Sequence, residues 1–149
     1  MTVTVRLDAA HPLLPEAARL LDAYRQHYGA NPAPQVVERW MREQVAGERM
    51  RVYAAGPGDR VLGVGTVAVV PASLTLRTVW LLRDLYVDPD ARRHGVARAL
   101  LAAVADEGRR EGAHRLSLQT EPTNTRALNL YAKAGFEPVT DVTLLHRML

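Results

Sequence analysis

The spacing of apolar positions along the chain predicts four helices. Between Pro15 and Gly29 apolar side chains recur every three or four residues, which places them on one helical face. Proline suits the first helical turn and glycine suits the residue after the last turn, so these two residues also mark the ends of the segment. The predicted helices run from Pro15 to Gly29, from Pro34 to Gly47, from Val96 to Glu111, and from a cap at Thr123 or Asn124 to Gly135.

Runs rich in β-branched and aromatic residues predict strands between these helices. The runs are Thr2–Leu7, Arg51–Ala55, Val61–Val70, Thr78–Val87, Arg115–Thr120 and Val139–Met148. Gly56-Pro57-Gly58-Asp59 has the composition of a turn, so the second and third strands should form a hairpin. A hairpin followed by strand–helix–strand units predicts an α/β fold with a mixed central sheet and helices on both faces.

The length and composition predict one folded domain. The chain has 149 residues, 48% of them hydrophobic and 23% charged, so we expect a single domain over residues 1–149. The absence of cysteine excludes disulfides, thiolate nucleophiles and cysteine-ligated zinc. The five histidines lack the spacing of metal ligands, so no metal site is expected.

The sequence favours neither a membrane nor a nucleic acid as a partner. No apolar stretch approaches the ~20 residues of a membrane helix, and the first residues do not resemble a signal peptide, so a cytoplasmic protein is expected. The nineteen basic residues are arginines except for Lys133, but a net charge of +3 is weak for binding a polyanion. Two Trp, five Tyr and one Phe offer a poor stacking surface for bases.

An arginine-rich loop connects the strand that ends at Val87 to the helix that begins at Val96. Its residues, from Asp88 to Gly95, are Asp-Pro-Asp-Ala-Arg-Arg-His-Gly. Free backbone N–H groups and the positive end of a helix dipole can bind a phosphate or pyrophosphate, and a glycine allows the ligand to approach closely. The alternative is a plain strand-to-helix connection with basic residues in solvent, and the loop alone does not decide between them.

Two segments around this loop resemble signatures of the GCN5-related N-acetyltransferase (GNAT) superfamily. Leu85-Tyr86-Val87-Asp88-Pro89, followed by Arg92-x-x-Gly95-x-Ala97, resembles its acyl-CoA motif. Asn124-x-x-Ala127-x-x-Leu130-Tyr131-x-Lys133-x-Gly135-Phe136 is similar to its second signature. The resemblance extends over Val52–Phe136 and implies the single-domain GNAT-like fold, with a homodimer as the expected assembly.

The resemblance also implies where acetyl-CoA binds. The central strand would separate from its neighbour, the pantetheine arm would bond to main-chain groups near Leu85 and Val87, and the pyrophosphate would lie on the amides of Arg93–Arg98. Arg92 would hold the loop or touch a phosphate. The cofactor-binding residues implied in this way are Leu85, Tyr86, Val87, Arg92, Arg93, His94, Gly95, Val96, Ala97, Arg98, Asn124 and Tyr131.

Acetyl transfer to an amine also needs a group that handles the amine's charge. An alkyl amine with a pKa near 10.4 is mostly ammonium at pH 7, which costs about 4–5 kcal/mol. Asp84 on the central strand is the first candidate for a base or a cation anchor, and Glu121 is the second; the alternative for Asp84 is neutralisation by a nearby arginine. Many family members carry an acidic or amide residue immediately before this aspartate, whereas this chain has Arg83, which leaves the base role open and disfavours polycationic amines.

Tyr131 is the candidate acid for the departing CoA thiolate. A phenol with a pKa of about 10 keeps its proton at neutral pH and can donate it. The resemblance assigns this role, since a tyrosine on the apolar stripe of a helix is otherwise typical of a core residue. Asn124 would by analogy contact the pantetheine arm, and its alternative role is the helix N-cap.

These features predict an acetyl-CoA-dependent N-acetyltransferase that acts on a primary amine of a small molecule by direct attack in a ternary complex. The alternatives are a protein or peptide amine acetyltransferase and a non-catalytic acyl-CoA sensor. The acceptor pocket is expected between the first two helices and the central strand, where Tyr24, Tyr28 and Trp40 could line it. Core positions are the alternative, and the one that helical periodicity favours, for all three.

Overall fold

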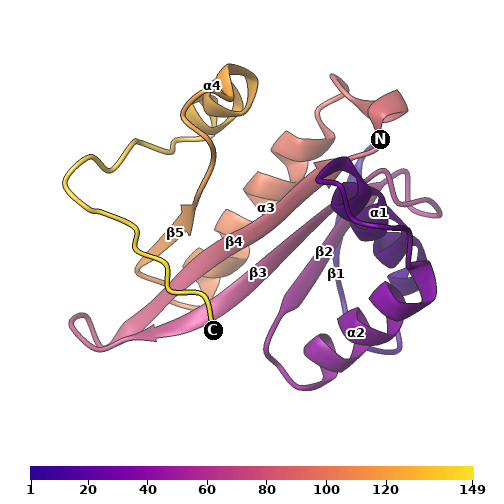
Figure 1. Cartoon of the computed structure of the whole chain (residues 1–149), viewed down its shortest axis with the longest axis horizontal. Coiled ribbons are helices and arrows are strands. Elements are labelled where there is room, and N and C mark those ends of the chain that lie inside the picture. The colour runs from indigo at the N-terminus through magenta and orange to yellow at the C-terminus, as the bar shows by residue number, and fades with distance from the viewer. The chain divides into compact units, whose positions relative to one another are not determined.

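A five-stranded sheet organises the first part of the chain in the computed structural model, which describes residues 1–149 (Figure 1). The strands are β1 (Val3–Leu7), β2 (Arg51–Gly56), β3 (Gly63–Ala72), β4 (Arg77–Val87) and β5 (Arg115–Leu118). They lie in the order β1-β2-β3-β4-β5, with successive antiparallel pairs from β1 to β4 and a parallel β4–β5 pair. The predicted mixed sheet is confirmed.

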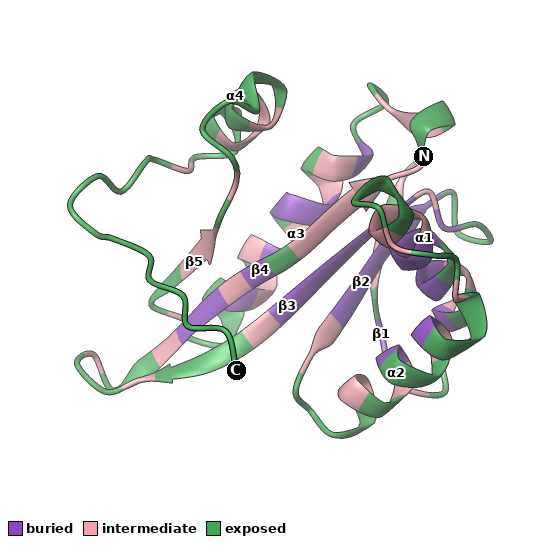
Figure 2. Cartoon of the chain, in the orientation of Figure 1, coloured by how far each residue is buried: buried purple, intermediate pink, exposed green.

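Helices cover both faces of this sheet. They are α1 (Leu14–His27), α2 (Pro34–Ala46) and α3 (Val96–Arg110). Val64 of β3 packs in a core cluster with Leu20 of α1, whereas the adjacent Gly63 faces Val96 of α3. Because successive residues of a strand point to opposite faces, α1 and α3 lie on opposite sides of the sheet. The buried residues follow these inner surfaces (Figure 2).

The chain divides into two compact units, Met1–Gln119 and Thr120–Leu149. The second unit contains one helix, α4 (Thr125–Lys133). The expectation of a single domain stays a prediction. No helix in either unit combines the length and the apolar character that a membrane crossing requires.

The predicted strand Val139–Met148 is wrong, because this segment forms no strand in the structure. A strand needs a hydrogen-bonded neighbour, and the sheet ends at β5. Apolar side chains of the segment, including Val142 and Leu145, are exposed. Apolar composition therefore indicates that a segment can join a sheet, but not that a partner strand is present.

Gly63 allows α3 to lie close to the sheet. A Cβ at this position would lie 2.5 Å from Cγ1 of Val96 and 3.1 Å from Cδ1 of Leu100. Both separations are shorter than ordinary contacts between carbon atoms. The missing side chain thus sets the distance between β3 and the N-terminal turns of α3.

Replacing Gly63 with valine should lower the free energy of unfolding by about 1–3 kcal/mol, because the added atoms overpack this contact. Urea denaturation measures the change. Gly65→Ala is the matched control on the same strand, since its Cβ would meet nothing nearer than 3.6 Å. Equal stabilities for wild type and Gly63→Val would contradict the close approach.

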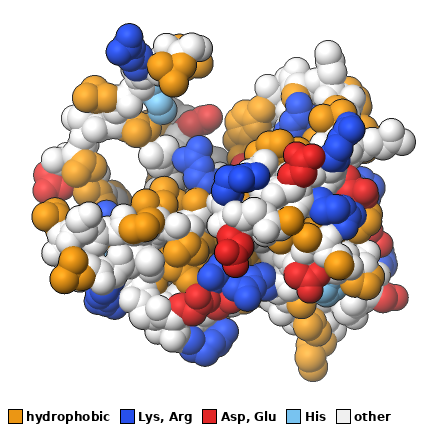
Figure 3. Space-filling model, turned by 90° about the horizontal axis from the view of Figure 1, so that it is seen from below, with side chains coloured by type: hydrophobic (Ala, Val, Ile, Leu, Met, Phe, Trp, Pro, Cys, Tyr) orange, Lys and Arg blue, Asp and Glu red, His pale blue; other side chains and the backbone are white.

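A charged cluster ties β1 and β2 to the C-terminal part of α3. Nη1 of Arg6 lies 2.7 Å from Oε1 of Glu107, and Nη2 of Arg51 donates a hydrogen bond of 3.0 Å to Oε1 of Glu111. The Arg51 guanidinium also lies 4.8 Å from the centre of the Trp80 ring. The hydrogen bond from Arg51 lowers the pKa of Glu111 below its ordinary value. Figure 3 shows acidic and basic side chains interspersed on the face that it displays.

The lowered pKa of Glu111 predicts a contribution to stability that acid removes. Because the folded state binds this proton less readily than the unfolded state, the stabilisation is present above the unfolded-state pKa and is lost as the pH falls through the folded-state pKa. Glu111→Gln should lower the free energy of unfolding by at most about 1 kcal/mol at pH 7, since the ion pair is partly exposed. Urea denaturation at pH 7 and at about pH 3 should show the difference shrinking in acid. A difference that is constant with pH would argue against this ion pair.

Candidate functional site

The edge of β4 is open over its last residues. β5 pairs only with Val79–Leu82, so Arg83–Val87 have no strand partner on that side. On the other side, Asp84–Val87 pair with β3. Figure 1 shows β5 turning away from β4. Unpaired main-chain N–H and C=O groups at a sheet edge can bond an added extended chain. The main chain of Leu85, Tyr86 and Val87 lies in this open stretch.

A β-bulge at Arg83 sets the direction of the side chains that follow it. Thr66 pairs with Asp84 and Val67 pairs with Leu82, so Arg83 has no residue opposite it. Beyond the bulge, Asp84 accepts a hydrogen bond from the hydroxyl of the buried Thr66. Asp84 therefore lies on the same face of the sheet as α1.

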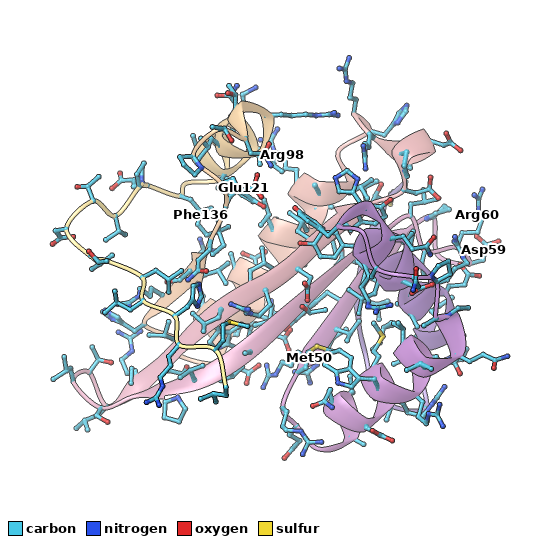
Figure 4. All side chains as sticks on the ribbon, viewed as in Figure 1. Met50, Asp59, Arg60, Arg98, Glu121 and Phe136 are labelled. Carbon is cyan, nitrogen blue, oxygen red and sulfur yellow. The ribbon has the colours of Figure 1, made fainter.

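The loop after β4 presents a row of main-chain donors. A short 3-10 turn, η1 (Pro89–Ala91), leads to Arg93 and Gly95, which both adopt left-handed conformations with φ of 68° and 80°. None of the backbone N–H groups from Arg93 to Arg98 donates a hydrogen bond within the chain. Donors in such a turn, at the positive end of a helix, form a concave site suited to a phosphate group. Arg98 lies on the first turn of α3 (Figure 4).

Arg92 and His94 hold this loop in place. Nε of Arg92 donates a hydrogen bond of 3.3 Å to the carbonyl of Val87, and its guanidinium lies 5.7 Å from the centre of the Tyr86 ring. Nδ1 of His94 lies 3.3 Å from the carbonyl of Ala91. Of the two roles expected for Arg92, the structure shows it holding the loop against β4.

A pocket of about 340 Å³ opens between α1, α2 and β4. Its lining residues are Leu21, Tyr24, Arg25, Tyr28, Ala30, Trp40 and Asp84. Tyr28 and Trp40 are 64% and 48% exposed, so the core positions favoured for them are wrong. The apolar face of α2 is wider than the surface that the sheet covers. Val37 and Met41 on this face are therefore buried, whereas Trp40 borders the pocket.

The Asp84 carboxylate makes no ion pair, so the structure does not support the alternative of neutralisation by a nearby arginine. The arginine that lines the same pocket, Arg25, binds Oδ1 of the buried Asp22 through Nη1 at 2.9 Å. Arg83 is exposed at the bulge. An unpaired carboxylate at a largely apolar pocket can anchor an ammonium group or accept a proton from it.

The remaining expected site residues belong to the second unit. Oδ1 of Asn124 accepts a hydrogen bond of 3.2 Å from the N–H of Ala127, which makes it the N-cap of α4. The half-buried Tyr131 packs edge-on against Phe136, with ring centres 5.9 Å apart. Glu121 is exposed, and its carbonyl accepts a hydrogen bond of 3.0 Å from the N–H of Asn124.

Sequence reasoning missed Thr66, although the sequence contains a signal for it. Thr66 is a polar residue within a strand of apolar and glycine residues that begins at Gly63, and its side chain is fully buried. A buried hydroxyl in such a run needs a hydrogen-bonding partner, which here is Asp84. No group of three acidic or histidine side chains is placed to hold a metal ion.

Comparisons with known proteins agree on one family. The acetyltransferase (GNAT) family matches residues 16–136. The "uncharacterized N-acetyltransferase YhfO" of Bacillus subtilis is 29% identical over 120 residues, which cover 80% of each protein. The ribosomal protein bS18-alanine N-acetyltransferase of Escherichia coli is 30% identical over 95 residues, which are 60% of this chain and 64% of that protein. A solved structure of a "probable acetyltransferase" aligns with a TM-score of 0.89 and 27% identity over 99% of this chain and 97% of that one.

Proposed function

Since the chain belongs to the acetyltransferase (GNAT) family, we propose that it is an N-acetyltransferase that moves the acetyl group of acetyl-CoA to a primary amine of a small molecule. The amine attacks the thioester directly in a ternary complex. One observation carries the proposal: Asp84, which lines the pocket, lies on β4. The open edge of the same strand leads to the free amides before α3. A site for an amine and a site for a phosphorylated donor thus share β4.

The residues around β4 fit the two ends of acetyl-CoA. Main-chain groups near Leu85 and Val87 on the open edge would bond the amide-containing pantetheine arm, as an added strand does, although the Val87 carbonyl already accepts a hydrogen bond from Arg92. The free N–H groups of Arg93–Arg98 would bind the pyrophosphate. Arg92 would act indirectly by keeping the loop against β4.

Asp84 is the proposed anchor and base for the amine. Its carboxylate would hold the ammonium form and take up its proton, while the Thr66 hydroxyl fixes the orientation of the carboxylate. The nitrogen lone pair then attacks the carbonyl carbon, and the bond from that carbon to sulfur breaks. Nitrogen loses its second proton in this step, and that proton replaces the one that the acid gives to sulfur. Glu121 is the second candidate for the base, in the other unit.

Tyr131 is the proposed acid for the departing sulfur, and Asn124 the proposed contact to the pantetheine arm in addition to its capping role. Tyr131→Phe should lower kcat about 100-fold or more, because the variant lacks the proton to donate. Its affinity for CoA should stay within about twofold, since the ring that packs on Phe136 is retained. Steady-state kinetics and calorimetry measure the two quantities, and an unchanged kcat would remove Tyr131 from the reaction.

The release of free thiol from acetyl-CoA tests the proposed function across small amines, polyamines, aminoglycosides and peptide N-termini. Calorimetry with CoA and with an analogue that lacks the pyrophosphate tests the loop, and we expect the analogue to lose most of the affinity. CoA binding without thiol release for any amine would favour the non-catalytic sensor. Unchanged affinity for the analogue would contradict the role of the free amides.

A second candidate function is acetylation of a peptide or protein amine. The similarity to the bS18-alanine N-acetyltransferase supports it. The pocket of about 340 Å³ favours the small molecule, because it lies near the lower end of the ~300–1,000 Å³ of small-ligand sites. The proposal also includes one catalytic domain over residues 1–149 and a cytoplasmic homodimer. The family match over residues 16–136 includes parts of both units, which supports the single domain.

A further inference from the structure

The pocket beside Asp84 has walls that select among amines. We infer that the acceptor is a primary monoamine that carries one aromatic or bulky apolar group, and that polycationic amines are poor acceptors. This inference rests on the proposed acetyl transfer and specifies its substrate class. It follows from the aromatic wall, the charges and the size of the pocket.

A line of aromatic rings runs from β4 to the outer end of α1. The Tyr86 ring, two residues from Asp84 on the same strand, lies 5.6 Å from the Tyr24 ring, which lies 5.1 Å from the ring of the exposed Tyr28. Trp40 of α2 adds a further aromatic side chain to the lining. Aromatic faces stack on flat apolar groups and also attract an ammonium ion. An amine held at Asp84 would therefore have an aromatic surface beside its body.

The charges of the lining match a single ammonium group. Asp84 is the one carboxylate in the lining, and Arg25 is the one other charged side chain. A second ammonium group on the substrate would find no second carboxylate in the lining, and Asp22 is already paired with Arg25. A cation that binding leaves without a partner weakens the complex, which acts against diamines and polyamines.

The size of the pocket limits the part of the acceptor that lies inside it. About 340 Å³ accommodates one ring with a short alkyl chain more readily than a body of several sugar rings. Leu21 and Ala30 make the remaining walls apolar. A short arylalkylamine satisfies the size, the charge and the apolar surface together.

Thiol-release kinetics with matched amines tests the substrate class. Phenethylamine has the aromatic body, ethylamine lacks it, and 4-(2-aminoethyl)benzylamine adds a second ammonium group to it. We expect kcat/KM for phenethylamine to exceed the values for the other two amines and for spermidine by about tenfold or more. Equal or higher values for ethylamine, the diamine or spermidine would overturn the substrate class and leave acetyl transfer standing.

Trp40→Ala tests the aromatic wall itself. The variant should lower kcat/KM about tenfold for phenethylamine, mainly through KM, and should leave the value for ethylamine within about twofold. Val36→Ala is the matched control, because Val36 is also exposed on α2 but does not line the pocket. Equal losses for both amines would contradict stacking on Trp40.

Fluorescence separates failure of the substrate class from failure of the proposed transfer. Trp40 borders the pocket and the only other tryptophan, Trp80, is buried, so phenethylamine added with CoA present should change the emission of Trp40. Trp40→Phe should abolish the change. Saturable binding of phenethylamine without thiol release would overturn acetyl transfer and support the pocket as a site for this amine. The absence of both the fluorescence change and thiol release would overturn the substrate class as well as acetyl transfer.

Discussion

Asp84→Asn should lower kcat/KM by about 10²- to 10⁴-fold, the range that a general base contributes. Asparagine keeps the shape of the side chain and can still accept the hydrogen bond from Thr66, but it has no negative charge for an ammonium ion and cannot take up its proton. The affinity for CoA should stay unchanged, since the free amides belong to another part of the site. Thiol-release kinetics and calorimetry measure the two effects.

A surface aspartate provides the control for this experiment. Asp59 is exposed in the turn between β2 and β3 (Figure 4), so Asp59→Asn should leave kcat/KM unchanged. If Asp84→Asn retains full activity while Glu121→Gln loses it, the base is Glu121 and the role proposed for Asp84 is wrong.

The largest loss of stability is expected from Asp22→Ala. Asp22 is 3% exposed, and its carboxylate accepts hydrogen bonds from Arg25 and Gln26 of α1 and from the N–H of Ala33, just before α2. Removal of the carboxylate leaves the half-buried N–H of Ala33 and the Arg25 guanidinium without their partner. We expect the free energy of unfolding to fall by about 2–4 kcal/mol, as measured by urea denaturation.

Asp106→Ala is the matched control for this loss. Asp106 also pairs with an arginine three residues further along its helix, at 2.8 Å, but both side chains are largely exposed. Its substitution should change stability by less than about 1 kcal/mol. Similar losses for the two variants would show that burial does not decide the contribution of Asp22.

The positions of the helices and of the first five strands could be predicted, because each has a clear apolar period and glycine or proline near its ends. The loop before α3 could be placed for the same reason. The direction of Asp84 could not, since the bulge at Arg83 shifts the alternation of side chains by one residue and depends on pairing with β3.

The errors have physical causes of the same kind. Periodicity showed which face of α2 carries Trp40, but not that the sheet stops short of covering that residue. The composition of Val139–Met148 suits a strand, but pairing depends on a neighbour that local sequence does not specify. Both errors concern contacts between segments rather than local conformation.

The acceptor pocket and the free amides draw on different stretches of the chain. Most of the pocket lining comes from residues 21–40, whereas the open edge and the amides lie within residues 83–98. Substitutions of the pocket-lining residues on and beside the first two helices could therefore change which amine is accepted without altering the binding of the acyl donor. Such a division would let gene duplicates acquire new substrates in few mutational steps, and directed evolution could restrict its libraries to that short stretch.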